Sequence, residues 1–410
     1  MISPSVILLA TALIPRPQDE EQSQAPFEVD RAPTSLSEAL TTGTRWVDLR
    51  MRAESVDEAG MDNRSLAMTL RGALGFKSAT YKGLTLGFEV EGNTNFGIDT
   101  YNDTLNGDVS RPIITDPSGA ELNQAWAYYE GVKGYTLRLG RQKLDLGNGR
   151  FVGSEPWRQN DRTFDALTVT RGLPDRLMLT AAYVYNVNGV TGGSSPLGDT
   201  ESSSLLLHGS YPLGARGVAE AYSYKVDLDH SLLPSTSTVG ARAEGEVDVL
   251  GKGLDFSGEF ANQRDGAGNP NRIDAGYAHL NLGTQFAAIT YKIGIEILQG
   301  SSTPGNKFTT PLGTAHKFNG LADMFVTTPM LGLDDTYYSM AGDWGGLQIA
   351  ATYHQFASYR NSQNYGTELD LTLTQVLASG LQTGLGTAQY NADSFGVDTL
   401  RAWIWMAYSF

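Results

Sequence analysis

The chain contains no cysteine, few basic residues and no long apolar run, and each shortage excludes a class of protein. The absence of cysteine excludes disulfide frameworks, thiol catalysis and cysteine zinc sites. Thirty Lys and Arg residues against 45 Asp and Glu residues give a net charge of -15, so no global field attracts the phosphates of nucleic acid. We therefore expect no nucleic-acid partner.

The longest apolar run near the start is VILLATALI at residues 6–14, which is too short to cross a bilayer as a helix. Its length suits the hydrophobic part of a signal peptide, although no Lys or Arg precedes it. The stretch that follows is rich in Pro, Gln and Glu, a composition typical of disorder. We expect residues 1–33 to be a signal peptide, a disordered leader or both.

Glycine and aromatic residues are abundant instead, with 47 Gly, 19 Tyr and 15 Phe, while only 18% of residues are charged. Short segments alternate strictly between apolar and polar residues, as in LTLGFEVEG (84–92) and ITYKIGIEI (289–297). This period of two is typical of β-strands with one apolar face, and no comparably long stretch has the helical period of 3.6. The chain is therefore predicted to be all-β.

The connections between these strands alternate in length along the whole chain. Glycine-rich short links, such as 131–134, 212–215 and 343–346, alternate with long polar ones, such as 96–120, 146–162 and 299–334. Transmembrane barrels have this asymmetry, because their periplasmic turns are short and their extracellular loops long. Residues 44–410 are therefore predicted to form a single antiparallel up-and-down transmembrane β-barrel of about 18 strands in the outer membrane of a Gram-negative-type bacterium.

The last ten residues, RAWIWMAYSF, alternate in the same way and end in an aromatic residue. Leu400, Ile404, Met406 and Phe410 lie on one face and Trp403 and Trp405 on the other. A terminal aromatic on an alternating strand resembles the signal by which outer-membrane barrels are recognised for insertion. Outer-membrane lipid is thus an expected partner.

No motif for catalysis or nucleotide binding is present. The glycines Gly147, Gly149 and Gly153 miss the dinucleotide spacing by one position, and no helical period follows them. The sequence NDTLNGD (102–108) imitates a calcium loop, but Ile113 occupies the position of the bidentate glutamate. We expect no catalytic residues, no metal site and no cofactor.

Residues 140–165 concentrate charge in one strand and the following long loop. The apolar alternation slips by one residue at Gly140, which predicts a β-bulge that turns Arg138, Arg141, Lys143 and Asp145 toward the lumen. Alternation elsewhere predicts a lumen of mixed sign. Its cations are Arg50, Arg52, Arg71, Arg138, Lys225, Arg242 and Lys292, and its anions are Glu89, Glu91, Asp227, Glu244, Glu246, Glu259, Glu296, Glu368 and Asp370.

The motifs GRQ (140–142), GNGRFVG (147–153), WRQND (157–161) and RTFDAL (162–167) resemble those of the alginate-export family of outer-membrane porins. HKFNGLADMF (316–325) resembles, more weakly, the long-loop segment of that family. The resemblance implies an eighteen-stranded monomeric barrel through which a polysaccharide passes passively. The mixed lumen charge does not fit a dedicated pore for a polyanion, because such a pore should be lined mainly by Arg and Lys.

The sequence thus predicts an outer-membrane channel, not an enzyme, that conducts a hydrophilic solute through an arginine-rich constriction formed by residues 146–162. A polysaccharide, an acidic oligosaccharide or another small anionic solute is the expected cargo. A weakly selective general porin, a barrel enzyme and a non-conducting scaffold are the alternatives. The residues predicted to line the pore and set its selectivity are Arg50, Arg52, Arg71, Glu89, Glu91, Arg138, Arg141, Lys143, Asp145, Arg150, Arg158, Arg162 and Asp165.

Overall fold

A computed structural model describes residues 32–173, 175–229, 234–249 and 251–410. The expected leader at residues 1–33 lies almost wholly outside the described residues. The described chain begins with a short helix, α1 (Leu36–Thr41), capped by the Ser35 hydroxyl, which accepts from the Glu38 backbone N–H. None of the described helices is long and apolar enough to span a bilayer.

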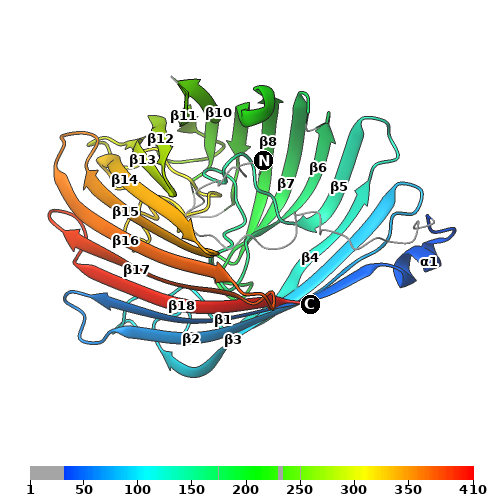
Figure 1. The fold of residues 1–410 in the computed structure, drawn as a ribbon, viewed down its shortest axis with the longest axis horizontal. Coiled ribbons are helices and arrows are strands. Elements are labelled where there is room, and N and C mark those ends of the chain that lie inside the picture. The colour runs from blue at the N-terminus through cyan, green and yellow to red at the C-terminus, as the bar shows by residue number, and fades with distance from the viewer. Residues whose placement is uncertain (1–31, 174, 230–233, 250) are drawn as a thin grey trace.

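The rest of the chain forms one 18-stranded antiparallel sheet in which each strand pairs with its neighbours in sequence. The first and last strands also pair, from Asp48 opposite Ser409 to Glu58 opposite Thr399, so the sheet closes into a barrel. Figure 1 shows β18 in red directly beside β1 in blue. The predicted up-and-down barrel of eighteen strands is confirmed.

The strands are β1 (Thr44–Glu58), β2 (Ser65–Lys77), β3 (Leu84–Thr100), β4 (Gly119–Tyr129), β5 (Tyr135–Gln142), β6 (Thr163–Arg171), β7 (Met178–Asn188), β8 (Asp199–Pro212), β9 (Gly217–Val226), β10 (Thr236–Val249), β11 (Lys252–Asp265), β12 (Asp274–Phe286), β13 (Ile289–Gln299), β14 (Gly332–Trp344), β15 (Leu347–Ala357), β16 (Asn364–Val376), β17 (Gln382–Ala392) and β18 (Thr399–Ser409). A 3-10 turn, η1 (Gly214–Arg216), connects β8 to β9.

Every link shorter than six residues lies at one end of the barrel, and every link longer than six residues lies at the other. The tightest links are two-residue turns, such as Gly345 and Gly346 between β14 and β15. Both of these glycines have positive φ, +67° and +89°, which is the backbone that a two-residue hairpin turn requires. The end with long loops is the extracellular end, and the end with tight turns is the periplasmic one.

The alternation of side chains along each strand separates an outer apolar face from an inner polar one. On β18, Leu400 and Ile404 are 48% and 55% exposed, whereas Trp403 and Trp405 on the opposite face are 7% and 5% exposed. The outer face of the barrel is therefore apolar and exposed, and the inner face is covered. A soluble protein has a polar exterior instead. The buried core lies inside the barrel, between the wall and the loops that fold into it.

Candidate functional site

The loop between β5 and β6, residues 143–162, lies inside the barrel against the inner face of β1. Arg50 Nη1 donates to the carbonyl of Pro156 at 2.8 Å, and Arg50 Nη2 also donates to the carbonyl of Arg158. The neighbouring inward residue, Arg52, donates to the carbonyl of Trp157, and its guanidinium lies 4.4 Å from the centre of the indole ring. Arginines of the wall therefore hold the backbone of this loop.

A second loop, residues 300–331 between β13 and β14, also folds inward. Its Phe308 and Leu312 side chains are essentially unexposed. Its backbone N–H groups at Leu321 and Ala322 donate to the carboxylates of Asp370 and Glu368 on β16, at 3.3 and 2.8 Å. The sequence marked this loop as long but placed no pore residue on it. The length of this loop and the family-like stretch 316–325 were the features of the sequence that could have indicated its role in the pore.

The two inner loops bind each other along a short stretch of parallel backbone. Val152 bridges Leu312, the Gly153 N–H donates to the Leu312 carbonyl at 2.9 Å, and the Arg162 guanidinium donates to the Gly313 carbonyl at 2.8 Å. Near this bridge the rings of Trp157 and His316 stack, with centroids 4.3 Å apart and planes 11° from parallel. The loops therefore form one body across the lumen.

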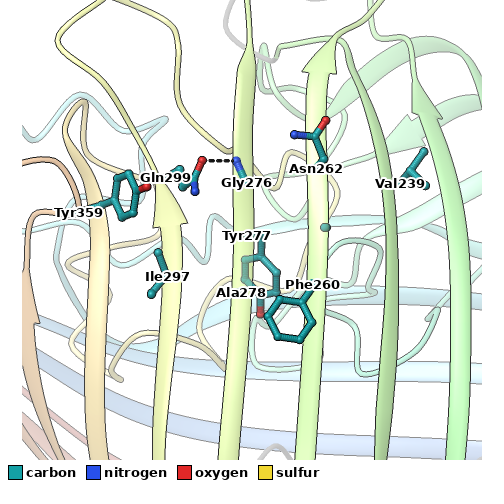
Figure 2. Close-up of a pocket in the computed structure, with 10 residues that line it drawn as sticks. Val239, Phe260, Asn262, Gly276, Tyr277, Ala278, Ile297, Gln299 and Tyr359 are labelled. Atoms are coloured by element: carbon teal, nitrogen blue, oxygen red, sulfur yellow. Dashed lines mark hydrogen bonds between the residues drawn. The ribbon is translucent and has the colours of Figure 1, made fainter.

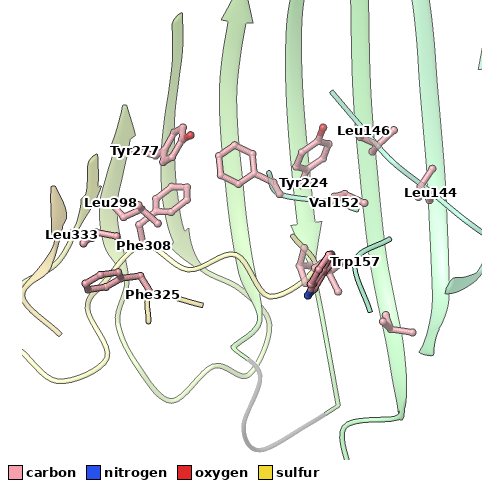
Figure 3. Close-up of a cluster of buried hydrophobic side chains, with 14 of the residues drawn as sticks. Leu144, Leu146, Val152, Trp157, Tyr224, Tyr277, Leu298, Phe308, Phe325 and Leu333 are labelled. Carbon is pink, nitrogen blue, oxygen red and sulfur yellow. The ribbon is translucent and has the colours of Figure 1, made fainter. Parts of the chain in front are cut away.

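Apolar packing joins this body to the wall. Phe151 of the first loop contacts Tyr277 of β12 edge-on at 5.0 Å between ring centroids and Phe308 of the second loop at 5.6 Å. Figure 3 shows members of this cluster, with Phe308 and Phe325 of the second loop near Leu298 and Leu333 of the wall. Trp157 of the first loop contacts Trp403 of β18 edge-on at 5.2 Å between ring centroids. Packing of this density fixes the loops in one position rather than leaving them mobile.

Two buried arginines of the first inner loop each face a carboxylate. Arg150 Nε lies 2.6 Å from Glu296, and Arg158 Nη2 lies 2.7 Å from Asp323. Arg401 on β18 lies 3.0 Å from the same Asp323 and 2.7 Å from Glu54 on β1. Burial alone would raise the pKa of Asp323, but His316, Arg401 and Arg158 outweigh it and hold that pKa well below its usual range.

Arg162 differs from the other loop arginines because backbone carbonyls alone are its hydrogen-bond partners among the described residues. Burial lowers its pKa, although Glu155 and Asp145 oppose that shift. Asp145 in turn accepts hydrogen bonds from the Ser154 backbone N–H at 2.8 Å and from its hydroxyl. These residues therefore shape the first loop.

Three buried carboxylates, Glu89, Glu91 and Asp161, bring oxygens within 4.8 Å of one another where the first loop meets β3. Two cations lie among them. Lys143 Nζ is 2.8 Å from Asp161, and Arg71 pairs with Glu91. These two side chains compensate the negative charge of the carboxylates. The group therefore joins the first loop to the wall of the barrel.

The predicted bulge at Gly140 is wrong. β5 pairs without a register shift with both β4 and β6, and the shifts lie in the neighbouring ladders β3–β4 and β6–β7. Gly140 takes φ +118° in its strand, and the apolar pattern slips because the strand ends at Gln142. Arg141 and its bidentate partner Asp165 consequently share the outward face with the exposed Leu139, while Arg138 lies inward.

Lys225 was also assigned to the wrong face. It pairs with Leu205, which is 39% exposed on the outer face, whereas its neighbours Tyr222 and Tyr224 are buried inside. Asp227 lies beyond the end of β9.

Lys317 is a candidate solute contact that the sequence did not single out. Its ammonium donates to the Asn148 carbonyl at 2.9 Å and lies 5.3 Å from the centre of the Phe318 ring. Within the described residues no carboxylate oxygen lies within ion-pair distance of it. Burial, and then the nearby Arg242, lowers the pKa of Lys317. Two further charges of the interior are Arg138, which is partly exposed, and Asp145, which is exposed.

A family model described as alginate export matches residues 47–307, more than half of the chain. The chain belongs to the alginate-export family. It is thereby an outer-membrane β-barrel of a Gram-negative bacterium, in a family of channels rather than enzymes, and the resemblance seen in the motifs of residues 140–167 is confirmed. No curated protein sequence matches this chain.

Solved outer-membrane barrels have the same fold. Pseudomonas aeruginosa OpdK with vanillate is 16% identical with a TM-score of 0.70, covering 90% of this chain and 99% of the other. Pseudomonas aeruginosa OpdO is 16% identical with a TM-score of 0.68, covering 91% and 98%. Acinetobacter baumannii OccAB4 is 15% identical with a TM-score of 0.67, covering 90% and 98%. At these identities the likeness concerns the fold.

Proposed function

We propose that this barrel passes an acidic hydrophilic solute, a polysaccharide or an acidic oligosaccharide, by passive diffusion through a constriction built from the loops 143–162 and 300–331. The observation that carries the proposal is the union of the two loops across the lumen, with Trp157 stacked on His316 and Arg162 bonded to Gly313. A loop body of fixed shape narrows a wide barrel to a selective passage. We further propose that the channel acts as a monomer.

The arginines of the constriction divide into two groups in this proposal. Arg50, Arg52, Arg150 and Arg158 hold the loops through carbonyls and carboxylates, and so determine the shape of the passage. Contact with the solute falls to the partly exposed cations Lys317 and Arg138, whereas Lys143 pairs with Asp161 and belongs to the contacts that hold the loop. Cations offer charge-assisted hydrogen bonds to carboxylates, and because they are partly exposed these bonds remain weak enough for release.

The mixed sign of the interior supports a short acidic solute over a long uniform polyanion. Glu244 and Asp145 lie near Lys317, so a solute meets both signs within the passage. The solved OpdK structure holds vanillate, an aromatic carboxylate, which extends the candidate cargo to small organic acids.

Single-channel current across a planar bilayer tests the proposal. An acidic oligosaccharide should block the current at lower concentration than a neutral one of equal length. Replacing both inner cations, Lys317→Gln with Arg138→Gln, should weaken the acidic block by about tenfold per cation, because each replacement removes one charge-assisted hydrogen bond to the solute. Lys133→Gln, in an exposed periplasmic turn, is the matched control and should leave the block unchanged.

Current without block by either sugar would assign the protein to weakly selective diffusion and overturn the specific cargo. An acidic block that survives the double substitution would overturn the role given to the two cations. No current at all from a fully folded barrel would reject the channel and favour a non-conducting scaffold.

A further inference from the structure

The outer surface of the barrel carries a groove toward the extracellular ends of β10 to β13. It has a volume of about 480 Å³ and is lined by Val239, Phe260, Gly276, Ile297 and Tyr359 among others. Figure 2 shows Phe260 and Ile297 on neighbouring strands on either side of the strand that carries Gly276 and Ala278. Val239 and Phe260 are 58% and 57% exposed, so the groove is open to the surrounding membrane.

Polar side chains mark the extracellular edge of this groove. Asn262 and Gln299 flank Gly276, and the Gln299 side-chain oxygen accepts from the Gly276 backbone N–H at 2.8 Å. Tyr359, in the loop after β15, also lines the groove. A tyrosine beside amide side chains is typical of the boundary between hydrocarbon and headgroups. Groups further toward the loops therefore lie at headgroup level.

The next outward row of the sheet, one step closer to the loops, carries positive charge. Lys225 of β9, Ser237 of β10 and Arg264 of β11 are successive cross-strand neighbours, and the row ends at Asp274 of β12. Lys225 and Arg264 are exposed. Cations held at this level, directly above an apolar groove, match the arrangement of phosphate above acyl chain in a lipid.

Two loop arginines add to this row. Arg272 lies just before β12, and Arg360 directly follows Tyr359 of the groove, and both are exposed. No ion pair joins any of the four cations to an acid within the described part of the chain. The nearby acids are Asp265, which accepts from the Ile273 backbone N–H, and Asp274 and Asp334.

We propose that this face binds a phosphorylated glycolipid of the outer leaflet, with an acyl chain in the groove and phosphate on the cations above it. Guanidinium groups bind phosphate oxygens in a bidentate manner. A lipid without phosphate cannot make these hydrogen bonds. An acyl chain in the bilayer is already removed from water, so its contact with the groove adds little, and the phosphate contacts provide the selectivity. The site lies on the outer wall and does not depend on the cargo of the channel.

Native mass spectrometry of the purified full barrel, with lipid A added in phosphorylated and in dephosphorylated form, tests this. The unsubstituted barrel should retain the phosphorylated form at least fivefold more, and the triple variant Lys225→Gln, Arg264→Gln, Arg360→Gln should lose that preference. Replacing the same two arginines by lysine should keep most of it. Arg64→Gln, an exposed arginine of another extracellular loop, is the matched control and should behave like the unsubstituted barrel.

Equal retention of the two lipid forms would overturn the proposal, as would an equal loss of preference in the Arg64→Gln control. A dimer that dissociates in the triple variant would assign the face to a second copy of the chain and overturn it as well. A triple variant that fails the usual heat-dependent mobility test for a closed barrel is replaced by the single variants Lys225→Gln, Arg264→Gln and Arg360→Gln, each of which should lose part of the preference. Channel current should be the same in all these variants, so the outcome is separate from that of the transport experiment.

Discussion

Inside the barrel, the position of an arginine decides whether it builds the constriction or faces the solute. Arg52, which is 1% exposed, contacts Trp157, Asp116 and Glu54 together, so its charge is compensated before any solute arrives. Lys317 has a carbonyl and a ring as neighbours and is partly exposed. A buried cation paired with a carboxylate fixes the shape of the passage, whereas an exposed cation attracts an acidic solute.

Asp323 is the residue on which the second loop depends most. It accepts from Arg158 and His316 and pairs with Arg401. Asp323→Asn keeps the shape but leaves buried cations without their counter-charge, so opening of residues 313–323 should become easier by about 3 to 5 kcal/mol. Hydrogen exchange of these amides measures it. Asp108→Asn, at a partly exposed carboxylate paired with Arg111, is the control, and equal exchange in the two variants would contradict the assignment.

The depressed pKa of Asp323 also fixes the sign of a pH effect. A carboxylate whose pKa is lowered in the folded state stabilises that state above its unfolded pKa, and the stabilisation is lost only as the pH falls through the folded value. Because the folded value lies well below the usual range for Asp, the loop should remain anchored at pH 4. Exchange of residues 313–323 at pH 7 and pH 4, corrected for intrinsic rates, checks this, and early release at pH 4 would contradict it.

Among the wall elements, β4 has the weakest attachment on one side. Its ladder with β5 ends at Ala125 opposite Arg141, although β4 continues to Gly119 along β3. Arg141 extends the contact, because its guanidinium donates to the Leu122 carbonyl at 3.1 Å while it holds Asp165 in a bidentate pair. The side chain thus replaces a bond of the missing backbone ladder.

Arg141→Met should therefore loosen the upper part of β4. The loss of one charge-assisted hydrogen bond to a backbone carbonyl corresponds to about tenfold faster amide exchange in residues 119–124. Arg171→Met, at the periplasmic end of β6, removes an outward arginine that contacts the Tyr135 ring and serves as control. If both substitutions raised exchange in β4 alike, Arg141 would have no special role in closing the wall.

The strands could be predicted from the sequence because each one repeats the same two-residue pattern against lipid. The course of the inner loops could not, since their burial depends on contacts such as Arg150 with Glu296 and Trp157 with His316, between segments far apart in the chain. The predicted inward orientation of Arg141 was wrong for a local reason. The end of β5 at Gln142 and a bulge both shift the apolar pattern by one residue.

At the scale of the whole molecule, the barrel is closed by the pairing of its first and last strands. The Val47 N–H donates to the carbonyl of Phe410 at 2.8 Å, and the Phe410 N–H donates back to Val47 at 3.1 Å. The Phe410 ring itself is 64% exposed and adds little to closure. The number of strands and the closure of the barrel could be predicted from the alternation of short and long links. The packing that narrows the lumen could not, because it joins residues from both halves of the chain.

Phe410→Ala keeps the closing backbone bonds, so the finished barrel should be nearly as stable as before. Assembly into vesicles that contain the bacterial insertion machinery should nevertheless fall several-fold, because the terminal aromatic resembles the signal for insertion. The assembled fraction is read from heat-dependent mobility on a gel. Phe286→Ala, at a 72% exposed aromatic of the same barrel end, is the control, and an equal fall in both variants would point to general loss of lipid contact.

The network around Asp323 has a consequence for the order of assembly. Arg401 on the last strand pairs with Glu54 on the first strand and with Asp323 on the second inner loop, so one cation joins the seam and the loop body. The full network exists only after the last strand has arrived beside the first. A chain whose last strand has not yet paired therefore lacks the final contact that holds its constriction. The constriction takes its final form only after the barrel has closed.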